Sequence, residues 1–150
     1  MKMNLVLAAA MSLAAAAPVL AESHGGMVEA SGDAAAGEKA FRQCIACHVV
    51  ENDEGETLAG RAAKVGPNLY GVAGRQAGHI EGFRYSKSME EAGEEGLVWT
   101  EEEFVSYVQD PTSYLREYLD DAKARGAMTH KVRKEQEAID VYAYLADLAK

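Results

Sequence analysis

The pentapeptide Cys-Ile-Ala-Cys-His at residues 44–48 constrains the fold of this chain more than any other feature. Cys44 and Cys47 are the only two cysteines among 150 residues. Two cysteines separated by two residues and followed directly by a histidine are typical of a c-type haem attachment site. If the stretch is helical, both thiols and the imidazole of His48 share one face. The thiols can then bond to the haem vinyl groups while the imidazole reaches the iron.

Two other kinds of site use a similar spacing. A thioredoxin-like redox pair occurs in a βαβ context, which the pattern of this chain lacks. A zinc site takes four ligands, and the chain offers no further cysteine. The sequence therefore predicts one covalent haem c, and the identity of the sixth iron ligand decides between an electron carrier and an enzyme.

The N-terminal 21 residues have the features of a secretory signal peptide. An apolar and small-residue run over residues 5–17 precedes a small residue, Ala21, that suits cleavage. The run is shorter than the roughly 20 residues of a membrane span, and an uncleaved anchor is the alternative. We expect residues 1–21 to be removed, residues 22–32 to form a flexible N-terminus and residues 33–150 to form one domain in the periplasm.

The charge balance excludes several classes of partner. The chain carries 15 basic and 24 acidic residues. Removal of residues 1–21 takes away Lys2 and no acid, which leaves 14 basic and 24 acidic residues and a net charge of −10. A chain this acidic is not expected to bind nucleic acid or anionic membranes.

Periodicity predicts short helices and no convincing strand, so the expected fold class is all-α. Asp33 is expected to cap a helix that runs to about Cys47, in which Gly37 indicates a close approach of another helix. Thr100 and Glu103 form a capping box for a later helix. The remaining expectations are a loop over 49–64, short helices over 88–93 and 112–119, and a last helix that opens at Lys134 or Glu135.

From about Asp33 to its C-terminus the chain resembles the soluble class I bacterial cytochromes c, in particular the larger members of the cytochrome c-two type. The motifs that carry the resemblance are specific and stand in the family order. They are Gly37 with Phe41, residues 44–48, Gly66-Pro67-Asn68-Leu69, Gly74-Arg75, Gly82-Phe83-Arg84-Tyr85-Ser86, Trp99, Tyr107, Met128 and Ala143-Tyr144-Leu145.

The resemblance implies a role for each of these positions. Cys44 and Cys47 hold the haem, and His48 is the proximal iron ligand. The carbonyl of Pro67 is expected to accept a hydrogen bond from the other imidazole nitrogen, which fixes the ring. The other implied haem contacts are Leu69, packed on the haem, Tyr107, near the distal ligand, and Arg75, Tyr85, Ser86 and Trp99, which reach a propionate. Gly37 and Phe41 are expected to cross Val141 and Tyr144.

Three methionines follow the signal peptide, and Met128 is the expected sixth ligand. Met27 falls in the N-terminal segment and Met89 in a Ser/Glu-rich one, whereas Met128 follows Gly126 and matches the family position. The alternative is a core methionine that fills a gap. A thioether ligand raises the haem potential and closes the sixth site. This favours a carrier over a peroxidase or a sensor, so we expect no enzyme activity.

The sequence around Met128 departs from the family pattern, which often reads Thr-Lys-Met-x-Phe. Here residues 126–130 read Gly-Ala-Met-Thr-His. The hydroxyl before the ligand is missing, which removes the basis for one propionate contact. His130 stands where an aromatic side chain normally covers the haem edge. It either provides that cover or displaces Met128 under some conditions.

Basic residues gather around Met128 although the chain as a whole is acidic. No acid occurs between Lys123 and Lys134. We interpret this segment as a basic lip that docks acidic partners, with a solvated loop as the alternative. The resemblance implies a bc-type quinol-oxidising complex as donor and a terminal oxidase, photosynthetic reaction centre or reductase as acceptor, for a protein expected to be a monomer. The lip consists of Lys123, Arg125, Lys131, Arg133 and Lys134.

Overall fold

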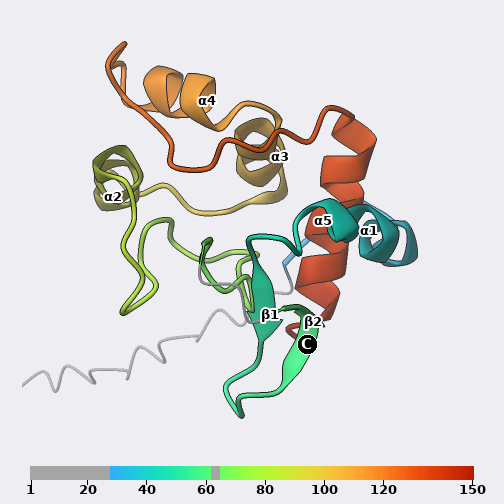
Figure 1. The fold of residues 1–150 in the computed structure, drawn as a ribbon. Helices are drawn as coiled ribbons and strands as arrows, with labels where there is room; N and C mark the ends of the chain where they lie inside the picture. Colours follow the sequence, from blue (N-terminus) through green and yellow to red (C-terminus); the bar gives the residue numbers. More distant parts are fainter. Residues whose placement is uncertain (1–27, 62–64) are drawn as a thin grey trace, which may run out of the picture.

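The computed structural model describes residues 28–61 and 65–150, and the predicted signal peptide lies outside these ranges. Short helices and long loops surround a central core, with one small sheet at the periphery (Figure 1). Within the described residues, no helix has both the length and the apolar character that a bilayer span requires. The elements are α1 (Ala34–Ala40), η1 (Phe41–Gln43), β1 (Val49–Glu51), β2 (Thr57–Gly60), α2 (Lys87–Glu94), α3 (Glu101–Gln109), α4 (Pro111–Tyr118) and α5 (Glu135–Asp147).

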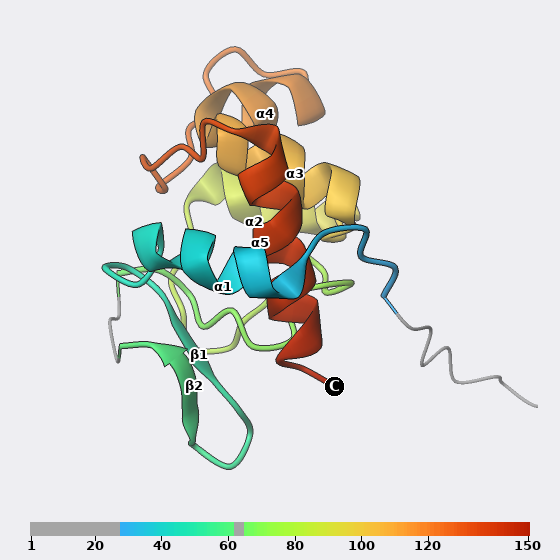
Figure 2. The same ribbon diagram turned by 90° about the vertical axis from the view of Figure 1, so that its right-hand side faces the viewer.

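Helix α1 lies across α5, and this crossing is the closest contact between helices (Figure 2). The side chain of Asp33 caps α1 by accepting from the amides of Ala35 and Ala36. A Cβ at Gly37 would collide with the backbone carbonyl of Asp140 on α5. The ring of Phe41 packs on Tyr144, with 5.7 Å between centroids. The predicted tight crossing is therefore confirmed, and glycine is required because the two backbones touch.

Replacing Gly37 with alanine is expected to lower the free energy of unfolding by about 1–3 kcal/mol, the usual cost of an overpacked contact. The obstacle is backbone, so neighbouring side chains cannot relieve it by changing rotamer. Denaturant unfolding of the haem-loaded protein, followed by circular dichroism, measures the effect. Gly55→Ala is the comparison, because Gly55 has nothing within 4 Å of its Cβ position but a φ of 80°. Its loss of stability measures backbone strain without a collision. An unchanged midpoint for Gly37→Ala would contradict the close crossing.

The first helix ends earlier than expected. Regular α-helix stops at Ala40, and a 3-10 turn follows over Phe41–Gln43. The haem-binding pentapeptide forms a separate turn, in which the amide of His48 donates to the carbonyl of Cys44 at 3.0 Å. This hydrogen bond joins two residues four apart in sequence, as in an α-helix. Cys44, Cys47 and His48 therefore still lie on one turn.

The loop expected over 49–64 contains a β-hairpin, so this part of the prediction was wrong. Strands β1 and β2 pair antiparallel, with a bulge between Val50 and Glu51. The Asn52 side chain organises the connection by accepting from the amides of Glu54 and Glu56. Strands of three and four residues are too short to show alternation, which explains why periodicity missed them.

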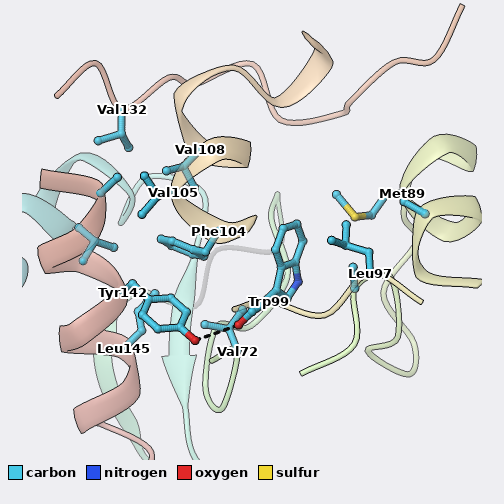
Figure 3. Close-up of a cluster of buried hydrophobic side chains, with 14 of the residues drawn as sticks. Val72, Met89, Leu97, Trp99, Phe104, Val105, Val108, Val132, Tyr142 and Leu145 are labelled. Carbon is cyan, nitrogen blue, oxygen red and sulfur yellow. Dashed lines mark hydrogen bonds between the residues drawn. The ribbon is translucent and has the colours of Figure 1, made fainter. Parts of the chain in front are cut away.

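Three helices after the hairpin begin at side-chain caps, of which the sequence predicted only Thr100. Thr100 accepts from the amide of Glu103 at 3.3 Å and starts α3, while Ser86 starts α2 and Asp110 starts α4 in the same way. Helix α3 packs on α5, α4 packs on α3 and α2 packs on α4, and their apolar side chains share one core, part of which is shown in Figure 3. There the hydroxyl of Tyr142 donates to the carbonyl of Trp99 at 2.9 Å. Trp99 is thereby tied to the C-terminal helix.

The folded contacts begin before Asp33, within the segment expected to be flexible. Both the amide and the hydroxyl of Ser31 donate to the carboxylate of Glu101. A Cβ at Gly32 would lie 2.7 Å from the carbonyl carbon of Ile139. Contacts with α3 and α5 therefore begin at Ser31, two residues before the expected start of the domain.

Candidate haem site

A largely apolar cavity of about 210 Å³ lies between the Cys-Ile-Ala-Cys-His turn and the segment that carries Met128. All eleven residues expected to contact the haem line this one cavity, although they come from positions 44 to 128. They are Cys44, Cys47, His48, Pro67, Leu69, Arg75, Tyr85, Ser86, Trp99, Tyr107 and Met128. The structure thus brings the whole predicted set together.

The imidazole of His48 is fixed in one orientation. Its Nδ1 lies 2.9 Å from the carbonyl oxygen of Pro67, and because a carbonyl can only accept, Nδ1 carries the hydrogen. A Cβ at Gly66 would lie 2.7 Å and 2.8 Å from the two ring nitrogens, so glycine lets the loop pack flat on the ring. Burial lowers the pKa of His48. A neutral ring that donates from Nδ1 keeps Nε2 available as a metal ligand.

Met128 sits on a segment without regular secondary structure, but hydrogen bonds to three helices hold that segment. Next to Met128, the amide of Gly126 donates to Thr112 on α4 at 3.3 Å, and that of Val132 donates to the carbonyl of Val108 on α3 at 2.8 Å. The amide of Arg125 donates to Ser88 on α2 at 3.0 Å. These contacts fix the thioether at the cavity wall.

Polar groups of the cavity wall come from the loops before α3. Arg75 donates to the backbone carbonyls of Tyr70 and Asn68, at 2.7 Å and 3.2 Å. Burial lowers the pKa of Arg75 and raises that of Tyr85. Burial likewise raises the pKa of Tyr107 above its usual range. The tyrosines therefore remain neutral, and the guanidinium is the cation placed to meet an acidic group of a ligand.

Several lining residues were not expected, and Met89 is the most important of them. It is 5% exposed and lies beside Leu97 in the core (Figure 3). Its polar neighbours in sequence suggested an exposed position. A buried Ala92 three residues later, on the same face of α2, is the signal that could have located it. The other unexpected lining residues include Gln43, Val72, Phe83, Phe104, Val108, Val132 and Val141.

His130 also lines the cavity and lies at its edge. Its Nε2 is 3.0 Å from the side-chain oxygen of Gln43. Gln43 is held in turn by a bond to the Ala40 carbonyl at 3.1 Å. The ring is exposed and spans from the Met128 segment to the residue before Cys44. This position is that of a cover over the cavity edge.

The donor set and the shape of the cavity fit a c-type haem. Two thiols and an imidazole from residues 44–48 and the thioether of Met128 line the same cavity, whose lining is mainly apolar. Burial, with Cys47 as a lesser cause, raises the pKa of the Cys44 thiol to about 11. The thiol is therefore neutral at physiological pH.

All five residues of the basic lip are exposed, but two of them form ion pairs. Lys131 lies 2.6 Å from Asp110, and Lys134 lies 2.8 Å from Glu137. Among the described residues, Lys123, Arg125 and Arg133 form no ion pair. These three are therefore the cations most available to a partner.

Comparisons with known proteins agree with this site. No family model matches the chain. The chain is 79% identical over 121 residues to cytochrome c2 of Rhodovulum adriaticum. The matched segment covers 81% of this chain and 96% of that protein. It is 51% identical over 150 residues to cytochrome c2 of Cereibacter sphaeroides, covering 99% and 98% of the two chains.

Solved structures give the same result. The crystal structure of cytochrome c2 from Rhodobacter sphaeroides superimposes with a TM-score of 0.77 at 57% identity, covering 79% of this chain and 97% of that one. Cytochrome c2 from Rhodobacter capsulatus gives a TM-score of 0.74 at 47% identity over 79% and 100% of the chains. The predicted all-α fold and the covalent haem are confirmed. This chain belongs to the cytochrome c2 family of class I cytochromes c, monohaem electron carriers that hold one haem c covalently, here through Cys44 and Cys47.

Proposed function

We propose that the protein carries single electrons between membrane redox complexes with His48 and Met128 as axial iron ligands. The observation that carries this proposal is that both side chains line the same cavity, with His48 fixed by Pro67. The haem supplies a one-electron Fe(III)/Fe(II) couple. Bound by the His48 imidazole and the Met128 thioether, the iron would favour the reduced state and would have no open coordination site.

The protein's own residues orient and shield the redox centre. Pro67 holds the tautomer of His48, and the loop bonds around Met128 keep its thioether in place. Arg75 supplies a half-buried positive charge, and neutral Tyr85 adds a hydroxyl in the same pocket. We assign propionate contacts to these two side chains, with Ser86 and Trp99 beside them. The apolar lining excludes water, which also raises the potential.

The absorption spectrum of the oxidised protein tests the ligand assignment. We expect a Met–iron charge-transfer band near the red end of the spectrum and slow or absent binding of carbon monoxide to the reduced native protein. Both results follow from a filled sixth site. A high-spin ferric spectrum, or rapid carbon monoxide binding without denaturation, would instead favour a haem enzyme or a sensor.

The site of action proposed here is the periplasm, with a bc-type quinol-oxidising complex as donor and a terminal oxidase, a reaction centre or a reductase as acceptor. The signal-like pattern of residues 1–21 and the similarity to cytochromes c2 support this proposal. Removal of residues 1–21 leaves residues 22–150 as the mature monomer. Mass spectrometry of the mature N-terminus checks the cleavage, and a protein that still begins at Met1 would refute it.

Docking to these partners is proposed to use the basic lip at the exposed edge of the cavity. Arg125 and Arg133 flank Met128 in sequence and have exposed side chains. The remaining surface is rich in glutamate, including the first turn of α3. This asymmetry would orient the protein with the cavity edge toward an acidic partner.

A further inference from the structure

The stretch of chain that carries Met128 forms backbone hydrogen bonds only at its two ends. At one end the amides of Arg125 and Gly126 donate to side chains of α2 and α4, and at the other the amide of Val132 donates to α3. None of these partners belongs to the Cys-Ile-Ala-Cys-His turn. Among the described residues, no backbone amide or carbonyl from 127 to 131 forms a hydrogen bond. The middle of the stretch is therefore held through its side chains.

Two of these side chains form hydrogen bonds, and they reach different parts of the fold. Lys131 donates to Asp110, at the start of α4, across 2.6 Å. His130 bonds to Gln43, the residue directly before Cys44. Within the part of the chain that the structure describes, the His130–Gln43 bond is thus the one hydrogen bond that links residues 125–132 to the segment that holds the haem.

The side chain of Gln43 is itself held in one orientation. Its Nε2 donates to the carbonyl of Ala40 at 3.1 Å and lies 3.5 Å from the carboxylate of Glu137. Both groups accept hydrogen bonds, so the amide nitrogen faces them and Oε1 faces His130. Nε2 of His130 therefore donates to Oε1 across 3.0 Å. Through Gln43, the end of α1 and the first turn of α5 are tied to the Met128 stretch.

We propose that this bond is a clasp through which Gln43, as a positioning residue, keeps the Met128 thioether on the iron. The inference rests on the proposed ligation by Met128, two residues before His130. The middle of the stretch can swing outward without breaking a hydrogen bond of its own backbone, so the clasp is a bond that opposes this movement. A hydrocarbon ring at position 130 could cover the cavity edge, but it could not donate such a bond.

The rate at which the iron loses Met128 measures the strength of the clasp. Free imidazole binds the haem-loaded ferric protein only after the sixth ligand has left, so at high imidazole concentration the binding rate levels off at the rate of ligand loss. Disappearance of the red-end charge-transfer band follows the reaction by stopped-flow absorption. We expect Gln43→Leu to raise the limiting rate about 2- to 10-fold, which corresponds to the net contribution of one hydrogen bond.

A double-mutant cycle separates loss of the clasp from general loosening. His130→Phe keeps a ring at the cavity edge but removes the donor. In that background, Gln43→Leu should change the limiting rate by less than about twofold, the usual error of additivity. His130→Phe alone combines the lost bond with a new apolar contact, so only the comparison between the two backgrounds counts. Denaturant unfolding of each variant checks that the helices are intact.

Gln136→Leu is the matched control. Gln136 donates to Asp140 within α5 at 2.9 Å, and it is not among the described residues that line the cavity. Its limiting rate should equal that of the unchanged protein. An equal rate in Gln43→Leu and the unchanged protein, the same rise in Gln136→Leu, or the same rise in both backgrounds would overturn the clasp alone. An unchanged protein without the charge-transfer band would refute the Met128 ligation and the clasp with it.

Discussion

Replacing Met128 with alanine is expected to leave the haem attached but to open the iron. Cys44 and Cys47 lie on a different segment from Met128, so the thioether bonds to the haem do not depend on it. Loss of a neutral sulfur ligand should lower the potential on the order of 0.1 V, a fraction of the roughly 0.8 V range that axial ligands control. The red-end charge-transfer band should disappear, and carbon monoxide should bind rapidly. Redox titration and absorption spectroscopy measure both effects.

Met89 provides the control for this experiment, because it is the other methionine that lines the cavity. Met89→Leu conserves the side-chain volume, so its effect on stability should stay below about 1.5 kcal/mol. The charge-transfer band should remain. If Met89→Leu abolishes the band and Met128→Ala keeps it, the sixth ligand is Met89 and the assignment made here is wrong.

Reversing two charges of the basic lip is expected to slow electron exchange with membrane partners by roughly 10- to 100-fold at low ionic strength, within the range that electrostatic steering covers. Arg125→Glu with Arg133→Glu suits this purpose. Neither side chain forms an ion pair among the described residues, so the exchange leaves Lys131–Asp110 and Lys134–Glu137 intact. Stopped-flow kinetics with membranes that contain a bc-type complex measures the rate.

The control variant, Lys39→Glu with Lys150→Glu, changes the net charge by the same amount. Lys39 lies on α1 and Lys150 at the C-terminus, and both are exposed; Lys150 lies 2.8 Å from Asp147, so the control also breaks one exposed ion pair. Its rate should stay near that of the unchanged protein. The defect of the lip variant should vanish toward 1 M salt, where the screening length falls to about 3 Å. Equal rates for both variants at low salt would remove the lip from the docking surface.

The sequence was most informative where a residue type has one structural use. Gly37 predicted the helix crossing because only a missing Cβ allows contact with the Asp140 carbonyl. Thr100 predicted the start of α3 because its hydroxyl can satisfy a free amide there. In the cavity, the prediction rested on the order of the family motifs. The carbonyl oxygen of Pro67 lies at Nδ1 of His48, as the resemblance implied.

Prediction failed where structure depends on contacts between distant segments. The β1–β2 hairpin has too few residues for a readable alternation, and it depends on the side-chain bonds of Asn52. The 3-10 turn over Phe41–Gln43 follows α1 directly, and no glycine or proline at the junction marks the change of helix type. Met89 has charged neighbours in sequence, but the face of α2 that carries Met89 packs on the core, and the side chain therefore reaches the cavity. Apart from the spacing of Met89 and Ala92 on α2, the local pattern contains none of this information.

The tight seat of His48 also bears on how fast an electron can leave or arrive. Gly66 packs flat on the ring and Pro67 holds Nδ1, so the imidazole cannot tilt or rotate when the charge on the iron changes. Dipoles that are already oriented need no rearrangement at the moment of transfer. With His48 as the proposed iron ligand, we expect a small inner reorganisation energy on its side of the haem. A small reorganisation energy lets electron transfer proceed quickly even when donor and acceptor differ little in potential.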